Sequence, residues 1–166
     1  MTVLVAYTSR AGSTRGVAER IAARLQTHGY AVHLDPLLGR EEVNRFEAVV
    51  LGSPIYSGAW ETEAVDFLLR NARALAGRPL WTYSVGWVGK NGVTHDAKGL
   101  DEIQRLAPAR EHRFFAGALD ASDLKLIQRI AFRRRGGQSG DLRDWAAIDA
   151  WADEIARQLT AITSAR

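Results

Sequence analysis

Two short, unbroken runs of apolar residues constrain the fold of this chain more than any other feature. Residues 3–7 (VLVAY) and 48–52 (AVVLG) are each too short for an ordinary helix, and polar or turn-forming residues follow each run. A strand that is apolar at successive positions is buried on both faces, which is typical of a parallel sheet covered by helices. The two runs therefore predict central strands of an α/β fold.

A helical pattern follows each of these strands. Residues 14–25 place Val17, Ile21 and Leu25 on one face, and His28-Gly29 ends this first helix. Residues 61–75 predict a second helix. Its inner stripe is expected to consist of Val65, Leu68, Leu69 and Ala72.

The rest of the chain continues the alternation of strands and helices. Further strands are expected at residues 31–34, 80–85 and 114–119, with a weaker helix at 100–106 and a closing helix capped by Asp144. The apolar stripe of the closing helix consists of Trp145, Ile148, Ala152, Ile155, Leu159 and Ile162. Such alternation predicts one domain over residues 1–166, with three α/β/α layers and a five-stranded parallel sheet of order 2-1-3-4-5.

The composition excludes several classes of site. The chain has no cysteine, so disulfides, thiolate metal sites and a cysteine nucleophile are ruled out. The four histidines lack the helical spacing of a metal-binding pair, and no metal site is expected. No run reaches the roughly 18 apolar residues of a membrane span, and the N-terminus lacks the basic start of a signal peptide. We therefore expect a cytoplasmic protein.

The positive charge is concentrated in one segment near the C-terminus. The net charge is +3, whereas residues 124–140 carry five basic side chains and no acidic one, which leaves −2 for the rest. These basic residues are Lys125, Arg129, Arg133, Arg134 and Arg135. The segment predicts either a solvated helix face or a surface for peripheral contact with an anionic membrane or redox partner. Nucleic-acid binding is disfavoured, because interleaved aromatic residues and a binding motif are both missing.

The loop after the first strand has the composition of a phosphate-binding site. It reads Ser9-Arg10-Ala11-Gly12-Ser13-Thr14 and joins a strand to the N-terminus of a helix. Small residues let backbone N–H groups converge at the positive end of the helix dipole, and the hydroxyls add donors. The alternative is that Ser13 or Thr14 only caps the helix. The loop matches neither the Walker motif nor the dinucleotide fingerprint.

Two later loops could hold a flat aromatic ring. The first contains Pro54, Ile55, Tyr56, Ser57 and Gly58, and the second contains Val85, Gly86, Trp87, Val88 and Gly89. A flat, largely apolar ring system needs aromatic faces and backbone groups at its polar edge, which glycine-flanked Tyr56 and Trp87 can supply. Trp60, at the start of a helix, is expected to lie in the core instead.

These loops carry a resemblance to a known family. The pattern of Val5, Tyr7, Ser9, Gly12, Thr14, Ala18 and Ile21 resembles the flavodoxin signature, from which Ala6 departs by being smaller than usual. The resemblance implies a flavodoxin-like fold that binds flavin mononucleotide (FMN), with the first loop on the phosphate and the two later loops on the ring. The flavin itself would carry the chemistry, so no catalytic side chain is expected.

The C-terminal third resembles one branch of that family. The run 116–120, the basic segment, Gly136-Gly137 and Asp144-Trp145 look like menaquinone-dependent protoporphyrinogen dehydrogenases. This resemblance implies an FMN-dependent oxidoreductase that passes electrons from a small, porphyrinogen-like donor to a quinone. Residues 90–113 depart from the branch, because their charge is nearly balanced where family members are often basic.

Two other functions stay open. The first is a flavodoxin-type electron carrier without a substrate of its own, which the basic charge disfavours because such carriers are typically acidic. The second is a regulatory domain that binds no cofactor, which the presence of all three loops disfavours.

Overall fold

A parallel β-sheet forms the centre of the molecule. In this computed structural model, the described residues are 1–37, 43–56, 58–86, 88–89, 92–93, 105, 107–119 and 140–165. The main strands follow the order β2-β1-β3-β5-β8, and each neighbouring pair is parallel. Their bounds are β1 Thr2–Tyr7, β2 Ala31–Asp35, β3 Ala48–Tyr56, β5 Leu80–Gly86 and β8 Glu111–Ala116. This order confirms the predicted doubly wound arrangement.

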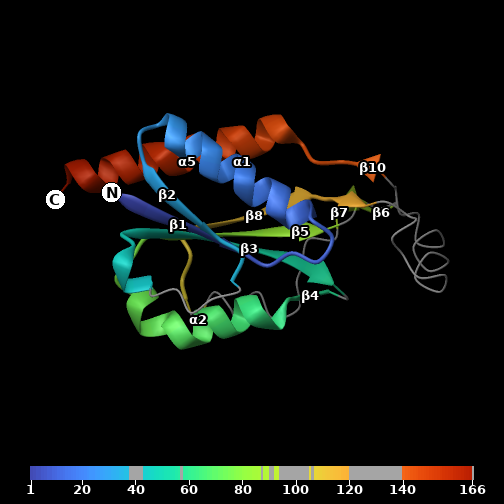
Figure 1. The fold of residues 1–166 in the computed structure, drawn as a ribbon, viewed down its shortest axis with the longest axis horizontal. Helices are drawn as coiled ribbons and strands as arrows, with labels where there is room; N and C mark the ends of the chain where they lie inside the picture. Colours follow the sequence, from blue (N-terminus) through green and yellow to red (C-terminus); the bar gives the residue numbers. More distant parts are fainter. Residues whose placement is uncertain are drawn as a thin grey trace.

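Helices cover both faces of the sheet (Figure 1). Helices α1 (Ser13–Thr27) and α5 (Trp145–Ser164) lie side by side on one face, and α2 (Thr62–Leu75) lies on the other. Each face has its own buried cluster: Val3, Val5, Ile21 and Ile155 belong to the first, and Leu4 belongs to the second. Alternate residues of β1 therefore fill two cores, which is why this strand is apolar at every position.

The ends of α1 and α5 follow the predicted signals. His28 caps the C-terminus of α1, and Gly29 has a positive φ of 85°, which glycine adopts without strain. The Asp144 side chain accepts a hydrogen bond from the Ala147 backbone N–H at 2.9 Å, so the predicted N-cap of α5 is confirmed. The predicted inner faces are confirmed as well, because Val17, Ile21, Leu25, Ile148, Ala152, Ile155 and Leu159 are buried. Trp145 and Ile162, at the two ends of the predicted α5 stripe, are only partly buried against the same core.

The predicted stripe of α2 is wrong in part. Ala64, Phe67, Leu68 and Leu75 are buried, whereas Leu69 is 49% exposed. The stripe is shifted towards Ala64 and Phe67, because only the packing against the sheet selects which of two adjacent leucines turns inward. The predicted helix at residues 100–106 lies outside the described residues, apart from residue 105.

Two predicted strand bounds also differ from the structure. β3 continues through Gly52 to Tyr56, and a Cβ atom on Gly52 would lie only 2.0 Å from the Tyr83 ring of β5. Gly52 therefore makes room for a buried neighbour rather than ending the strand. β8 spans Glu111–Ala116 instead of the predicted 114–119, and Ala118–Leu119 forms a separate strand. The earlier start reflects the sheet edge, where a strand accepts charged residues that a central strand excludes.

Short two-residue strands extend the loops around the sheet. β4 (Ala59–Trp60) pairs with the end of β3, β6 (Val88–Gly89) pairs with β7 (Gly92–Val93), and β9 (Ala118–Leu119) pairs with β10 (Gly140–Asp141). All three pairs are antiparallel, and none was expected from the sequence. A 3₁₀ turn, η1, spans Val43–Arg45.

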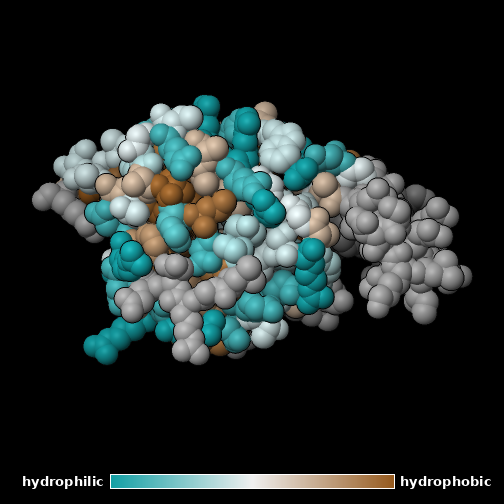
Figure 2. Space-filling view, viewed as in Figure 1, coloured by the Kyte–Doolittle hydropathy of each residue, from teal (hydrophilic) through white to brown (hydrophobic). Residues whose placement is uncertain are grey.

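Hydrophilic and intermediate residues cover most of the coloured surface in Figure 2, with one brown patch towards the side of the molecule where both termini lie. This surface is what the apolar runs predict, because they place most of their side chains in the two cores. Among the described residues, no helix has the length and apolar character needed to cross a membrane.

Candidate functional site

The first predicted loop opens the N-terminus of α1 towards solvent. Gly12 is the N-cap residue, has a φ of 81°, and makes no side-chain cap hydrogen bond. A Cβ atom built on Gly12 would have no heavy atom within 4 Å, so the space over the loop is open. The N–H groups of Ser13 and Thr14 have no acceptor within the described part of the chain. Unpaired N–H groups at a helix N-terminus suit an anion.

The Ser9 side chain stabilises this loop by accepting two backbone hydrogen bonds. Its Oγ accepts hydrogen bonds from the backbone N–H groups of Gly12 at 3.1 Å and Arg15 at 3.4 Å. Ser13 instead turns towards β9, where its Oγ accepts the Ala118 N–H at 2.8 Å. Thr14 is almost fully buried beneath the loop. The loop is therefore held by its own hydroxyls, while main-chain donors remain open for a ligand.

A buried polar network joins this loop to the end of β3. The Thr8 N–H donates to the Gly52 carbonyl at 3.0 Å, and the Ser53 Oγ, fully buried, accepts the Glu61 N–H at 3.0 Å. These bonds fix the distance between the first and second predicted loops. The sequence analysis missed Thr8, Ser53 and Glu61, although Glu61, the first residue of the predicted helix 61–75, was a visible signal for a carboxylate at a helix N-terminus; in the structure it is the N-cap of α2.

Arg10 bridges the first and second loops from above. Its Nη2 lies 2.8 Å from the Glu61 Oε2, and its guanidinium lies 5.0 Å from the centre of the Tyr56 ring. Glu61 is only 6% exposed, whereas the Arg10 side chain is 68% exposed. The hydrogen bond to Glu61 raises the pKa of Arg10, which stays charged. The structure thus places a fixed cation over an aromatic face rather than directly over the α1 N-terminus.

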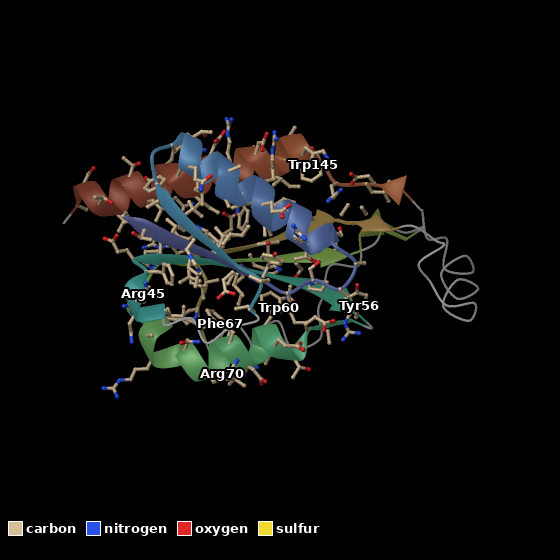
Figure 3. All side chains as sticks on the ribbon, viewed as in Figure 1. Arg45, Tyr56, Trp60, Phe67, Arg70 and Trp145 are labelled. Carbon is tan, nitrogen blue, oxygen red and sulfur yellow. The ribbon has the colours of Figure 1, made fainter. Side chains whose placement is uncertain are left out.

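The β3–β4 turn presents Tyr56 and hides Trp60. Figure 3 shows Tyr56 at the end of β3 and Trp60 between the sheet and α2. Tyr56 is 40% exposed, and partial burial raises the pKa of its hydroxyl. Gly58 allows the turn with a φ of 80°. Trp60 is buried, as expected, and its Nε1 donates to the Ser84 Oγ at 2.8 Å.

His112 completes a second buried network beneath the same turn. Its Nε2 lies 3.1 Å from the Ser84 Oγ, and its Nδ1 lies 2.8 Å from the Thr82 Oγ1. Burial lowers the His112 pKa to about 4, so the ring is neutral near pH 7. A neutral ring between two hydroxyls and Trp60 supports the turn from below. The sequence held no signal for this network, because these residues lie on different strands.

The structure describes the third predicted loop only in part. Gly86 lies at the end of β5, and its carbonyl accepts the Gly117 N–H at 2.7 Å. The backbones of Val88 and Gly89 pair with β7. Ser57 and Trp87 lie outside the described residues, so their role at the ring stays a prediction. Pro54, Ile55 and Val85 lie on neighbouring strands β3 and β5, at the carboxyl edge of the sheet.

The arrangement can therefore bind an anionic group and a neighbouring flat ring. Open amides lie at α1, Tyr56 offers an aromatic face, and Arg10 supplies a positive charge between the two loops. No cluster of groups that could hold a metal ion occurs among the residues whose placement is described. The predicted absence of catalytic acid–base residues stays untested.

Several solved structures share this fold. The flavodoxin of Streptococcus pneumonia TIGR4 is 15% identical, with a TM-score of 0.61 over 95% of this chain and 99% of that chain. A flavoprotein from Lactobacillus acidophilus NCFM, solved in complex with FMN, is 14% identical, with a TM-score of 0.54 over 68% and 92%. Rubredoxin oxygen:oxidoreductase from Desulfovibrio gigas is 16% identical, with a TM-score of 0.58 over 96% of this chain and 36% of that one. At such identities the likeness shows the fold alone.

Family membership comes from the sequence. No curated protein matches the chain. A family model described as a flavodoxin domain matches residues 4–135, which covers the phosphate-type loop and both predicted ring loops. The three loops gather at the carboxyl edge of a sheet with flavodoxin strand order. The chain belongs to the flavodoxin domain family.

Proposed function

We propose that this protein binds FMN and acts as an FMN-dependent oxidoreductase. The observation that carries the proposal is the N-terminus of α1, where, among the described residues, Gly12 leaves clear space and the N–H groups of Ser13 and Thr14 are unpaired. A phosphate dianion fits such a site because several amides and the helix dipole act on it together. The Lactobacillus acidophilus flavoprotein, which shares the fold, was solved with FMN.

Different residues would bind the phosphate and the ring of FMN. Ser9 holds the first loop, the amides of residues 13 and 14 would receive the phosphate, and Tyr56 would cover the ring. Bound FMN would supply the redox centre, which accepts and releases electrons. The contribution of the chain is to orient the ring, shield part of it from water and set the charge beside it.

Arg10 is the side chain expected to act electrostatically on the bound ring. Because Glu61 holds its guanidinium over Tyr56, a guanidinium paired with one carboxylate stands next to the expected ring position. A preorganised cation stabilises negative charge that develops during reduction of a flavin or binding of an anionic substrate. A quinone is the acceptor class that we propose. The porphyrinogen donor rests on the sequence resemblance alone.

An electron carrier is the second candidate function. It is favoured by the shared fold with flavodoxins such as that of Streptococcus pneumonia TIGR4. The net charge of +3 argues against docking on basic redox partners, because such docking depends on charge complementarity. The two candidates differ in whether a small molecule turns over at the flavin.

Anaerobic turnover of the FMN-reconstituted protein tests the proposal. The protein is reduced, and its reoxidation is followed by flavin absorbance with a series of quinones and, separately, with a one-electron protein acceptor. Rapid reoxidation by a quinone, together with oxidation of a porphyrinogen or another small donor, is expected. Reoxidation by the protein acceptor alone would establish a carrier, and failure to bind FMN would overturn both candidates.

Arg10→Met and Arg10→Lys provide a matched pair for the electrostatic argument. Arg10→Met removes the charge and is expected to lower the reduction potential of bound FMN, while Arg10→Lys is expected to retain most of it. A tenfold change in the relative affinity for the oxidised and two-electron-reduced forms corresponds to about 30 mV. Equal potentials in the parent and both variants would show that Arg10 does not act on the ring.

A further inference from the structure

Two short segments that are separated in the sequence meet at the first turn of α1. Residues 117–119 include β9 and residues 140–143 include β10, and we call these two segments together the arm. The two strands pair with each other in antiparallel fashion, and β10 leads into α5 (Figure 1). Within the described ranges, neither strand pairs with the central sheet. The position of the arm therefore depends on its contacts with α1 and with the end of β5.

Gly117 brings the outgoing strand of the arm into close contact with the candidate site. Its N–H donates to the Gly86 carbonyl at the end of β5 at 2.7 Å, and its own carbonyl accepts the Leu142 N–H at 3.2 Å. A Cβ atom on Gly117 would lie 3.0 Å from the Ser13 Oγ and 3.1 Å from the Val85 Cγ1. Glycine therefore lets the arm approach the phosphate loop and the end of β5 without displacing either of them.

Ser13 lies between the arm and the open N-terminus of α1. Its Oγ accepts the Ala118 N–H at 2.8 Å, whereas neither its backbone N–H nor its hydroxyl proton has an acceptor in the described part of the chain. A hydroxyl has one donor and two acceptor lone pairs, so Ser13 can hold the arm and donate to a phosphate at the same time. Hydrogen bonds in such a chain polarise one another, so each bond strengthens the other.

The returning strand of the arm contacts the same turn of α1. Arg143 donates to both carboxylate oxygens of Asp141 at 2.7 Å, and its guanidinium lies 4.4 Å from the centre of the Trp145 ring. These contacts fix the guanidinium against Gly16, where a Cβ atom would lie only 2.4 Å from the Arg143 Nη1. Glycine inside a helix lowers helix propensity, but at this position it makes room for the guanidinium. Both strands of the arm therefore contact the helix turn that carries the open amides.

We propose that the Ser13 side chain couples the binding of the FMN phosphate to the docking of the arm. The proposal rests on the proposed binding of FMN at the N-terminus of α1. Ser13 is a positioning residue in this scheme, because its N–H and O–H donate to the phosphate while its Oγ holds Ala118. FMN then stabilises the docked arm, and the docked arm raises the affinity for FMN by the same factor, since such coupling is reciprocal.

Amide hydrogen exchange of the full-length protein, followed by NMR with and without saturating FMN, tests the coupling. FMN is expected to slow exchange of the Ala118 and Leu142 amides at least about fivefold relative to Gly29, whose amide donates at the far end of α1. Saturating riboflavin, which lacks the phosphate, should leave both rates unchanged. Equal slowing by both ligands, or unchanged rates with FMN bound, would overturn the coupling alone. A protein that binds no FMN would overturn the proposed function as well.

Ser13→Ala and Ser9→Ala form a matched pair in the same loop. Each removes one hydroxyl and keeps the backbone N–H groups, and each is expected to weaken the binding of FMN. At saturating FMN, Ser9→Ala should retain the slowing at Leu142, because the Ser9 hydroxyl accepts hydrogen bonds only from Gly12 and Arg15 among the described residues. Ser13→Ala should lose this slowing, although the Leu142 amide does not donate to Ser13. Slowing at Leu142 that persists in Ser13→Ala would refute the role of its side chain.

Gly117→Ala and Gly77→Ala test the coupling from the side of the arm. The added Cβ atom lies 3.0 Å from the Ser13 Oγ in the first variant and meets no heavy atom within 4 Å in the second. Only Gly117→Ala is expected to raise the Kd for FMN, by about fivefold or more, with little change in the Kd for riboflavin. An unchanged Kd for FMN in Gly117→Ala, or equal losses for FMN and riboflavin, would show that the arm does not act through the phosphate and would contradict the proposal.

Discussion

Replacement of Gly12 by alanine tests the phosphate loop most directly. Gly12 has a φ of 81°, a backbone conformation that costs an L-residue about 1–2 kcal/mol. A Cβ atom at this position meets no heavy atom within 4 Å, so no steric clash adds to that cost. The variant is expected to lose about 1–2 kcal/mol of unfolding free energy without FMN, because the strain is confined to the backbone.

The same substitution is expected to weaken the binding of FMN. Relief of the strain rotates the amides that follow Gly12 away from their present direction, and FMN binding must restore them. Strain that is relieved before FMN binds no longer lowers the unfolding free energy, so the losses of stability and of affinity share about 1–2 kcal/mol. We therefore expect the Kd for FMN to rise by up to about 5–30-fold. Riboflavin lacks the phosphate, and its Kd should change little.

Gly29 offers a matched control at the other end of α1. It has a φ of 85° and equally open space for a Cβ atom, but it lies far from the loop in sequence and caps the opposite helix end. Gly29→Ala should destabilise the protein to the same extent in urea unfolding and leave the FMN titration unchanged. Equal FMN affinities in the two variants would refute the phosphate assignment. If Gly12→Ala lost the same binding affinity for FMN and for riboflavin, Gly12 would act on the ring instead of the phosphate.

Three further predictions address the ring, the buried histidine and the basic segment. Tyr56→Ala should weaken the binding free energy of FMN by about 1–3 kcal/mol in fluorescence titrations, because apolar contact with the ring is lost. An equal loss of thermal stability with and without FMN would show that Tyr56 is structural. The folded pKa of His112 is lowered from 6.5 to about 4, so the stability that depends on neutral His112 is complete above pH 6.5 and is lost as the pH falls towards 4. With His112→Gln, the free energy of unfolding in urea should change with pH by about 2–3 kcal/mol less in this window. An unchanged pH dependence would contradict the lowered pKa of His112. Reversal of arginines 133–135 to glutamate, outside the described residues, should abolish co-sedimentation with anionic vesicles at low salt and leave FMN binding intact; if the parent protein does not sediment with such vesicles, the segment is a solvated face.

The sequence alone determined the central sheet and the helices on its first face. Strands buried on both faces must be apolar throughout, and α1 and α5 repeat apolar residues at helical spacing, so local pattern and final environment agree. The sequence also predicts where the candidate site lies, because parallel strands bring the loops after β1, β3 and β5 to one edge. Gly12 could be found in the sequence because its conformation depends only on its own backbone.

The tertiary structure decided which side chains meet across that edge. Arg10 and Glu61 are distant in sequence, and nothing near either residue shows that the guanidinium turns to a buried carboxylate and to Tyr56 instead of lying over the first loop. The contacts of His112 likewise come from strands β5 and β8 lying in register. A sequence pattern indicates which positions face the core. Whether two polar side chains pair depends on the strand register that brings them together and on how deeply each of the two is buried.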